Sequence, residues 1–382
     1  MNPGWAILSG HYLNAWGLAD LILASGWSGR LVCLRRDREP TVLMSLYGRG
    51  VDVWTVPDSQ SLVDFLAQRI PIEDCKWLFF TEERSLEEIS AAKLHPWLTT
   101  ATWYPDVQCR LCEIMDRLLF YDLIAAKGLG NVPCTVSGEC DPFSEFGAQF
   151  FFRYRLTWVR GKKTPRIRLV RGRAEWQDAV RSGEAQGYGP ADWCYQEMLS
   201  LAPEDNVSVC GWHDPTNPRY VGTRKVLQFP ARQGNGDVCE LIELQTALAD
   251  TTRKLLDELR YTGPFELEFV RDTRTGRYCL IELNPRFWMQ HPLAGANLAQ
   301  VLVRRYLGMP DEIAPNGASP RYWVNTIVAL NRLLRADFRG WRYLRDPQAI
   351  RVPPLAVTLR WLPRFSVNLA LRQLRRSWPT FS

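Results

Sequence analysis

Short apolar runs alternate with helical patterns over the first hundred residues of the chain. The strand-like runs lie at 5–8, 31–34, 51–56 and 77–81. Leu18, Leu21 and Ile22 have helical spacing, and Gly26 is placed to end their helix. Strands that alternate with helices are typical of a parallel sheet with helices on its faces. The pattern predicts an N-terminal α/β domain over residues 1–105.

The pattern changes after this domain, and longer strands and helices follow. The predicted elements are a helix from about 106 to 127, two strands within 150–170, strands at 193–196, 207–212 and 220–227, and a helix from about 238 to 260. No Gly-x-x-x-x-Gly-Lys occurs, and no Gly-x-Gly-x-x-Gly follows the first strand. The N-terminal domain is therefore not expected to hold a nucleotide in the usual way.

The most informative segment is a hairpin pattern between Gly263 and Arg286. Apolar and acidic residues alternate over Phe265–Phe269, which puts Glu266 and Glu268 on one face of a strand. Residues 271–277 contain Asp-Thr-Arg-Thr-Gly, a sequence typical of a turn. A hairpin with one acidic face is therefore predicted.

The returning strand of this hairpin, Tyr278–Asn284, adds Glu282 and Asn284 to the acidic face. Pairing of the two strands brings Glu266 or Glu268 across from Glu282. Carboxylates this close repel each other unless a cation lies between them. Mg²⁺ prefers oxygen ligands and is often held by one or two carboxylates together with substrate phosphates. The alternative is a solvated acidic hairpin with paired surface charges.

This hairpin resembles the C-terminal metal motif of the ATP-grasp superfamily. That group includes carbamoyl phosphate synthetase large subunits, biotin carboxylase, D-alanine–D-alanine ligase and D-aspartate ligase. The resemblance implies that Glu268, Glu282 and Asn284 hold two Mg²⁺ ions, for which Mn²⁺ is an alternative. Glu266 remains an alternative to Glu268, because the sequence does not fix the strand register.

Upstream segments resemble the nucleotide site of the same superfamily. Trp193–Leu199 is similar to its hinge strand, which implies that Gln196, Glu197, Met198 and Leu199 meet the adenine. Asp205, or its neighbour Glu204, falls where a ribose-binding carboxylate is expected. Asp116-Arg117, followed by Val132-Pro133-Cys134-Thr135, resembles the first helix and loop of the nucleotide domain.

Two phosphate-binding positions depart from the superfamily pattern. The usual lysines are replaced by arginines, and the matching residues are Arg153 and Arg166. Arginine binds phosphate, often bidentately, but is not equivalent to lysine. The loop between these strands, normally glycine-rich, has only Gly161 among basic residues. Either side-chain charge holds the phosphates here, or ATP binding is weak or altered; a salt-bridged structural role for Arg153 is also open.

Two cations near the motif are candidates for catalysis. Arg286 follows Asn284 by two residues, and Lys225 lies on a strand that resembles the superfamily's cationic strand. Both are expected to stabilise charge on the phosphoryl oxygens and the tetrahedral intermediate. His291 is close in sequence, and it has either a structural role or a part in proton transfer from an amine.

The resemblance implies an α/β chain of four consecutive parts. These are an N-terminal parallel pre-ATP-grasp domain at 1–105, a central ATP-grasp lobe at 106–195, a C-terminal lobe with antiparallel strands and the metal site at 196–310, and a basic tail at 311–382. The implied activity is an ATP- and Mg²⁺-dependent, ADP-forming carboxylate–amine ligase that uses an acyl phosphate. A non-catalytic or regulatory ATP-binding protein and a small-molecule kinase are the alternatives.

Charge and composition bear on the partners. The residues from Arg321 onward include twelve Arg, no Lys and two Asp, a net charge of +10. The whole chain carries +6, which leaves −4 for residues 1–320. Such a tail is either the solvated side of terminal helices or a contact for an anionic surface. Nucleic acid is not expected as a partner; small carboxylate and amine substrates, such as amino acids or peptides, and a homodimer are.

The absence of secretion and membrane signals predicts a cytoplasmic protein. The first residues lack a basic start followed by a long apolar run, and no stretch reaches the length of a membrane span. The ten cysteines include one Cys-x-x-Cys spacing, and no second pair completes a zinc site. Free thiols in a reducing compartment fit this pattern.

Overall fold

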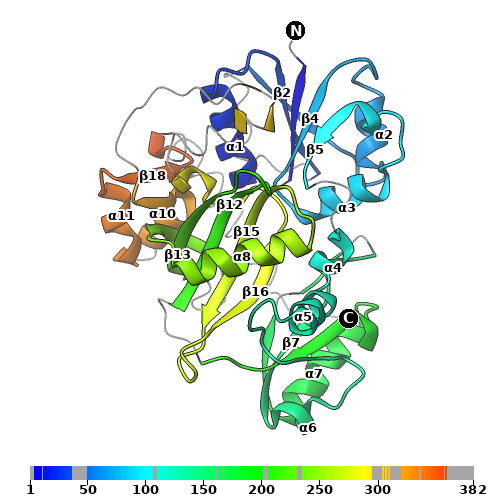
Figure 1. Cartoon of the computed structure of the whole chain (residues 1–382), viewed down its shortest axis with the longest axis vertical. Helices are drawn as coiled ribbons and strands as arrows, with labels where there is room; N and C mark the ends of the chain where they lie inside the picture. Colours follow the sequence, from blue (N-terminus) through cyan, green and yellow to red (C-terminus); the bar gives the residue numbers. More distant parts are fainter. Residues whose placement is uncertain are drawn as a thin grey trace. The chain divides into compact units, whose positions relative to one another are not determined.

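A computed structural model of the chain provides the structure (Figure 1). It describes residues 4–10, 12–36, 50–105, 110–160, 162–165, 167–200, 205–229, 235–294, 303–304, 306–307, 309, 320–334, 337–356 and 358. The chain forms two compact units, each made of separate stretches of sequence. Unit 1 is Met1–Tyr104, Lys225–Ile242 and Arg286–Ser382, and unit 2 is Pro105–Arg224 and Glu243–Pro285. The four consecutive parts suggested by the sequence stay a prediction.

The N-terminal part of unit 1 is the parallel α/β arrangement predicted from the sequence. Its strands are β1 (Trp5–Ser9), β2 (Arg30–Arg35), β3 (Val51–Thr55), β4 (Lys76–Phe80) and β5 (Ala101–Trp103), in the order β3-β2-β1-β4-β5. All four strand pairs are parallel. The helices are α1 (Tyr12–Ala24), α2 (Leu62–Ala67) and α3 (Glu83–Ala91). All five residues of β1 are buried, because β1 is the central strand.

The remaining part of unit 1 contains a strand where the sequence pattern suggested a helix. Its elements are β14 (Asn235–Ile242), η5 (His291–Ala294), β17 (Tyr322–Asn325), α10 (Thr326–Leu334), η6 (Phe338–Gly340), α11 (Trp341–Arg345) and β18 (Ala349–Val352). β14 pairs with β17, and Val238 lies opposite Val324 in their shared core. The predicted helix from 238 was therefore wrong in its first part, because distant strand pairing outweighs the local helical spacing of leucines.

The central lobe of unit 2 is a small antiparallel sheet with an aromatic core. Its elements are α4 (Leu111–Met115), α5 (Arg117–Lys127), β6 (Thr135–Ser137), α6 (Pro142–Phe146), β7 (Gln149–Tyr154), β8 (Trp158–Val159), β9 (Lys162–Lys163), β10 (Arg168–Arg171), α7 (Arg173–Glu184) and β11 (Trp193–Gln196). The strand order is β10-β7-β11-β6. Phe150, Phe152 and Trp193 are buried together in its core.

The predicted helix from 106 to 127 is two helices, and Asp116 separates them. Asp116 has ψ near 111°, outside the helical range, and its carboxylate accepts hydrogen bonds from the backbone N–H groups of Leu118 and Leu119. Aspartate at this position caps a new helix by satisfying N–H groups that have no helical partner. The break fixes where α5 starts, and Arg117 is its first residue. Residues 106–109 lie outside the described part of the chain.

The C-terminal lobe of unit 2 carries the predicted hairpin. Its elements are β12 (Asn206–His213), β13 (Arg219–Phe229, of which Arg219–Arg224 belongs to unit 2), α8 (Thr246–Glu258), β15 (Gly263–Arg271) and β16 (Tyr278–Asn284). β12 pairs with both β13 and β15, and β15 pairs with β16. Helix α8 packs against β12 and buries Leu248, Leu255 and Leu256 (Figure 1). The acidic face of β15 and β16 is the opposite side of these strands from Phe265 and Leu267.

Two further observations concern membrane-spanning helices and cysteines. Among the described residues, no helix combines the length and the apolar character needed to cross a bilayer. The nine cysteines in the described part of the chain are all free thiols. The cellular location stays a prediction.

Candidate active site

The strand register of the β15–β16 hairpin shows which of Glu266 and Glu268 lies opposite Glu282. Glu268 lies opposite Glu282, and Glu266 lies opposite Asn284. A β-bulge follows, because Phe269 pairs with Leu280 and leaves Ile281 as the extra residue. Leu280 and Glu282 would share a face in a regular strand, but the bulge turns them to opposite faces. Glu282 and Asn284 therefore join the acidic face of β15.

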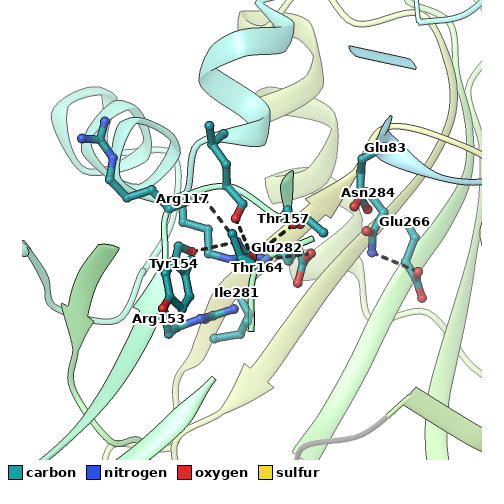
Figure 2. A network of polar contacts seen from close by, with 12 residues as sticks. Glu83, Arg117, Arg153, Tyr154, Thr157, Thr164, Glu266, Ile281, Glu282 and Asn284 are labelled. Atoms are coloured by element: carbon teal, nitrogen blue, oxygen red, sulfur yellow. Dashed lines mark hydrogen bonds and ion pairs between the residues drawn. The ribbon is translucent and has the colours of Figure 1, made fainter. Parts of the chain in front are cut away.

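The two cross-strand pairs on this face differ in burial. Glu266 and Asn284 are each 5% exposed, and the amide nitrogen Nδ2 of Asn284 donates a hydrogen bond to Glu266 Oε2 over 3.2 Å (Figure 2). Glu282 has 29% of its side chain exposed, and Glu268 is half-buried. Glu266 thus orients the Asn284 amide from within the sheet, while Glu268 and Glu282 lie nearer to solvent.

Arg117 brings positive charge from the central lobe to this face. Its guanidinium donates to the carbonyl oxygens of Tyr154, over 3.0 Å, and Arg155, over 3.3 Å. The same group lies 3.5 Å from Glu282 Oε1 (Figure 2). The N-terminal position of Arg117 on α5 and these carbonyls fix its direction. Arg117 belongs to the Asp116-Arg117 motif noted in the sequence, but it was not among the predicted site residues.

Tyr121 links helix α5 to the hairpin. Its hydroxyl donates a hydrogen bond of 2.6 Å to the carbonyl oxygen of Ile281, the bulge residue. Burial raises the pKa of the Tyr121 phenol, Arg153 and Arg117 oppose that rise, and Glu282 adds to it. Two arginines of the central lobe and one carboxylate of the hairpin therefore influence the pKa of the same buried phenol.

The donor set on the hairpin fits Mg²⁺. It offers carboxylate oxygens from Glu268 and Glu282 and an amide oxygen from Asn284, which are the hard ligands that magnesium prefers. Like charges directly opposite on neighbouring strands destabilise a sheet, and a cation between them removes that cost. Within the described residues, no three His, Cys, Asp or Glu side chains form a metal-holding group. The hairpin face therefore offers a cation two carboxylates and one amide oxygen, and a set of this size is one that substrate phosphates can complete.

The hinge strand β11 is tied to its neighbours through Gln196 and Glu197. Arg153 on β7 donates a hydrogen bond of 2.6 Å from Nη1 to Gln196 Oε1, and Gln196 is buried. Glu197 accepts from the backbone N–H of Cys134 over 2.7 Å through its carboxylate, and its own N–H donates to the Cys134 carbonyl. Glu197 thus holds the loop before β6 against the hinge, while Gln196 and Arg153 point toward one another.

The other predicted nucleotide residues lie around the end of the hinge. Met198 is 45% exposed, Leu199 is half-buried and Asp205 is buried. Arg166 and Glu204 lie outside the described residues. The neighbouring Arg168 pairs with Asp178 over 2.7 Å, and Arg155 pairs with Asp116 over 2.7 Å. Arg153 is therefore hydrogen-bonded to Gln196, whereas Arg168 and Arg155 form local ion pairs.

The two predicted catalytic cations lie in unit 1. Arg286 donates from Nε and Nη2 to Glu83 Oε1, the first residue of α3, over 3.3 and 3.1 Å. Lys225 is half-buried on β13. His291 is 1% exposed, its Nδ1 lies 2.6 Å from the Trp288 carbonyl oxygen, and burial lowers its pKa to about 4. His291 is therefore a neutral, buried side chain, as expected for the structural role.

Comparison with known proteins gives one match to a family. The model of the carbamoyl-phosphate synthase L chain, ATP binding domain, matches residues 242–309. This range contains α8, the whole hairpin and Arg286. No curated protein sequence matches the chain.

Solved structures resemble most of the chain. N5-carboxyaminoimidazole synthetase from Staphylococcus aureus, complexed with ADP, is 13% identical over 83% of this chain and 80% of its own, with a TM-score of 0.60. The biotin carboxylase domain of Hydrogenobacter thermophilus 2-oxoglutarate carboxylase, with MgADP and bicarbonate, is 13% identical over 84% and 73%, with a TM-score of 0.60. Campylobacter jejuni biotin carboxylase is 14% identical over 81% and 72%, with a TM-score of 0.59. The chain therefore has an ATP-grasp fold, which confirms the resemblance and the fold class inferred from the sequence.

Proposed function

We propose that the chain is an ATP- and Mg²⁺-dependent carboxylate–amine ligase that works through an acyl phosphate. The observation that carries this proposal is the hairpin face: Glu268 lies opposite Glu282, with Asn284 beside them and Arg117 3.5 Å from Glu282. Opposed carboxylates next to an arginine suit a site that holds both a divalent cation and phosphate groups. Similar proteins are described as complexed with ADP or with MgADP and bicarbonate.

The proposed residue roles follow from these positions. Glu268, Glu282 and Asn284 hold two Mg²⁺ ions, which neutralise phosphate charge when bound. Mn²⁺ suits the same oxygen ligands. Glu266 acts as a positioning residue, because it fixes the Asn284 amide through the 3.2 Å hydrogen bond. Hydrogen-bond partners of metal ligands hold those ligands in the productive orientation.

The nucleotide is proposed to lie along the hinge. Backbone groups of the segment Gln196, Glu197, Met198 and Leu199 bind the adenine, and Asp205 binds the ribose. Arg153 and Arg166 bind phosphate oxygens in place of the lysines of similar proteins. Arg153 is supported by its position beside Gln196 and by its action on Tyr121.

The proposed reaction has two steps that balance. A substrate carboxylate oxygen attacks the γ-phosphorus of ATP, the bond to the β-phosphate oxygen breaks, and ADP leaves. An amine nitrogen then attacks the acyl carbon, the carbon–oxygen bond to phosphate breaks, and the amine loses a proton as inorganic phosphate departs. Arg286 and Lys225 stabilise the negative charge that develops in both steps. The substrates are an amino acid or small peptide and a small amine, and the protein acts as a homodimer in the cytoplasm.

Two observations favour a second candidate, a regulatory protein that binds ATP without turnover. Arginine replaces lysine at Arg153, and Arg117 pairs with a carboxylate of the metal face. A site closed by this ion pair would bind nucleotide and leave the phosphates intact. A ligase forms products from ATP and such a binding protein forms none, so one assay separates the two candidates.

The test is product analysis with ATP, Mg²⁺ and panels of carboxylates and amines. A ligase releases ADP and inorganic phosphate in equal amounts only when both substrates are present. A kinase yields ADP and a stable phosphorylated product with one substrate. Binding of ATP without ADP under any substrate pair would overturn the ligase proposal. Chelation of Mg²⁺ by EDTA is expected to abolish turnover, and added Mn²⁺ to restore part of it.

A further inference from the structure

A group of exposed aromatic and basic side chains lies on η6 and α11 of unit 1. We call it the Arg/aromatic patch, and it consists of Phe338, Arg339, Trp341, Arg342 and Arg345. Phe338 is 63% exposed and Trp341 is 42% exposed. Two large aromatic rings this exposed within four residues, beside three arginines, are unusual for a protein surface that meets only water.

The patch is held firmly by the protein beneath it. Tyr343 and Leu344 on α11 are buried in the core that includes Val238 and Val324. The guanidinium of Arg351 donates to the carbonyl oxygens of Leu344, over 2.7 Å, and Asp346, over 2.8 Å. Arg351 thus fastens the turn between α11 and β18. The exposed rings are therefore presented by an ordered element.

The charge of the patch is only partly compensated. Asp337 pairs with Arg339 over 2.8 Å and with the buried Arg332 over 3.3 Å, so one carboxylate is shared by two arginines. Arg345 lies over the Trp341 ring, with its guanidinium carbon 5.9 Å from the ring centroid. The surface therefore combines positive charge with aromatic faces.

The sequence beyond the patch continues the same composition. Residues 359–382, outside the described part of the chain, contain five Arg and neither Asp nor Glu. They also contain two Trp, two Phe and five Leu. Leucine side chains do not stack on nucleic-acid bases, but they do partition into the boundary of a lipid bilayer. This aliphatic content favours a membrane surface over nucleic acid.

We propose that the Arg/aromatic patch docks the protein on the surface of an anionic phospholipid bilayer. Tryptophan and phenylalanine prefer the bilayer interface, where one side of the ring is apolar and the other is hydrated. Arginines close to an anionic leaflet each gain favourable electrostatic energy, which is lost beyond a Debye length. The patch supplies both the aromatic rings and the positive charge within the consecutive elements η6 and α11.

The test is co-sedimentation of the full chain with phosphatidylcholine vesicles, with and without phosphatidylserine. Binding is expected only to the vesicles that contain phosphatidylserine, and 0.5 M salt is expected to release it. The double variant R342E/R345E should bind roughly thirtyfold more weakly, from the loss of two favourable contributions. The double variant F338S/W341S should bind roughly tenfold more weakly, and should keep its salt dependence.

Matched control variants lie elsewhere on the surface. Arg181 has 68% and Arg253 has 57% of the side chain exposed, and R181E/R253E removes the same charge outside the patch. Leu94 is 87% exposed, and L94S removes an exposed apolar residue. These variants should bind vesicles as the parent chain does. Equal binding by the patch variants and these controls, equal binding to both kinds of vesicle, or no sedimentation would each overturn the proposal.

Nucleic acid is tested in the same experiment. A tenfold excess of a mixed-sequence oligonucleotide is expected to leave the vesicle-bound fraction unchanged. Complete displacement, with weaker oligonucleotide binding by R342E/R345E, would assign the patch to nucleic acid instead.

Discussion

The hairpin of β15 and β16 and the strands β7 and β11 build their parts of the site in different ways. In the hairpin, Glu268, Glu282 and Asn284 come from one segment of 17 residues joined by a tight turn. In the central lobe, Arg153 meets Gln196 across 43 positions of sequence, and Glu197 meets Cys134 across 63. The hairpin face is therefore set by local alternation, whereas the hinge is set by how distant strands pair.

This difference shows which kind of site residue can be predicted from the sequence alone. A two-residue period and a turn determine which hairpin side chains share a face. No such rule gives the partner of Arg153, because loop lengths and sheet order decide it. The following predictions probe the two regions, from the largest expected effect to the smallest.

Replacement of Glu282 by Gln tests the hairpin most directly. The change keeps the shape of the side chain but removes the charge that opposes Glu268, so ADP formation should fall on the order of a thousandfold. Turnover with Mg²⁺ should be measured together with urea unfolding, which should be nearly unchanged. Glu258→Gln, which removes a half-buried carboxylate 3.0 Å from Lys127 Nζ, is the control and should keep full activity. Full activity in Glu282→Gln would remove the metal assignment.

The register of the hairpin predicts unequal roles for Glu268 and Glu266. Glu268→Gln should lower kcat about a hundredfold, because it removes a proposed metal ligand. Glu266→Gln should lower it only about tenfold, because Glu266 acts through Asn284. The Mg²⁺ dependence of the rate is the measurement. The reverse order of the two effects would contradict the assignment of Glu268 as ligand.

The central lobe is tested through Arg153. Arg153→Met removes the hydrogen bond to Gln196 and a proposed phosphate contact, and KM for ATP should rise about tenfold. Arg153→Lys should recover part of this loss, since lysine keeps a positive charge at this position. Arg168→Met, which breaks an ion pair with Asp178 on the same sheet, is the control. An unchanged KM in Arg153→Met would assign Arg153 a purely structural role.

The smallest effect concerns the link between the two regions. Tyr121→Phe removes the hydrogen bond to the Ile281 carbonyl, and the free energy of unfolding should fall by about 1 kcal/mol. Tyr278→Phe removes an exposed contact with Gln245 and should cost less. Urea unfolding of both variants gives the comparison. Equal losses would mean that the bulge is not supported by Tyr121.

Much of the fold was predictable, and the failures have clear physical causes. The parallel sheet and the hairpin have strong local periodicity, and both were predicted correctly. The strand β14 was mistaken for helix because its partner Val324 lies 86 positions after Val238. The break at Asp116 depends on a cap that only the folded chain shows.

Within the site, the residues of the acidic face were predictable, but their pairing across the two strands was not. The bulge at Ile281 fixes that pairing, and adjacent apolar residues before Glu282 were its only signal. The contact of Arg117 with Glu282 joins positions 165 apart, so no local pattern reveals it. Glu268, Glu282 and Asn284 as metal ligands, and Arg153 and Gln196 through Leu199 as nucleotide ligands, stay predictions.

The interleaving of the two units along the chain has a consequence for synthesis on the ribosome. The last segment of unit 2 ends at Pro285, whereas unit 1 still needs the segment that begins at Arg286. Strand β14 must wait for β17, about 80 residues later, before its edge is paired. During that interval the edge is open to other chains, and unpaired edges favour aggregation. Slow translation over residues 243–321 should therefore lower the yield of folded protein, and chaperones that cover strand edges should restore it.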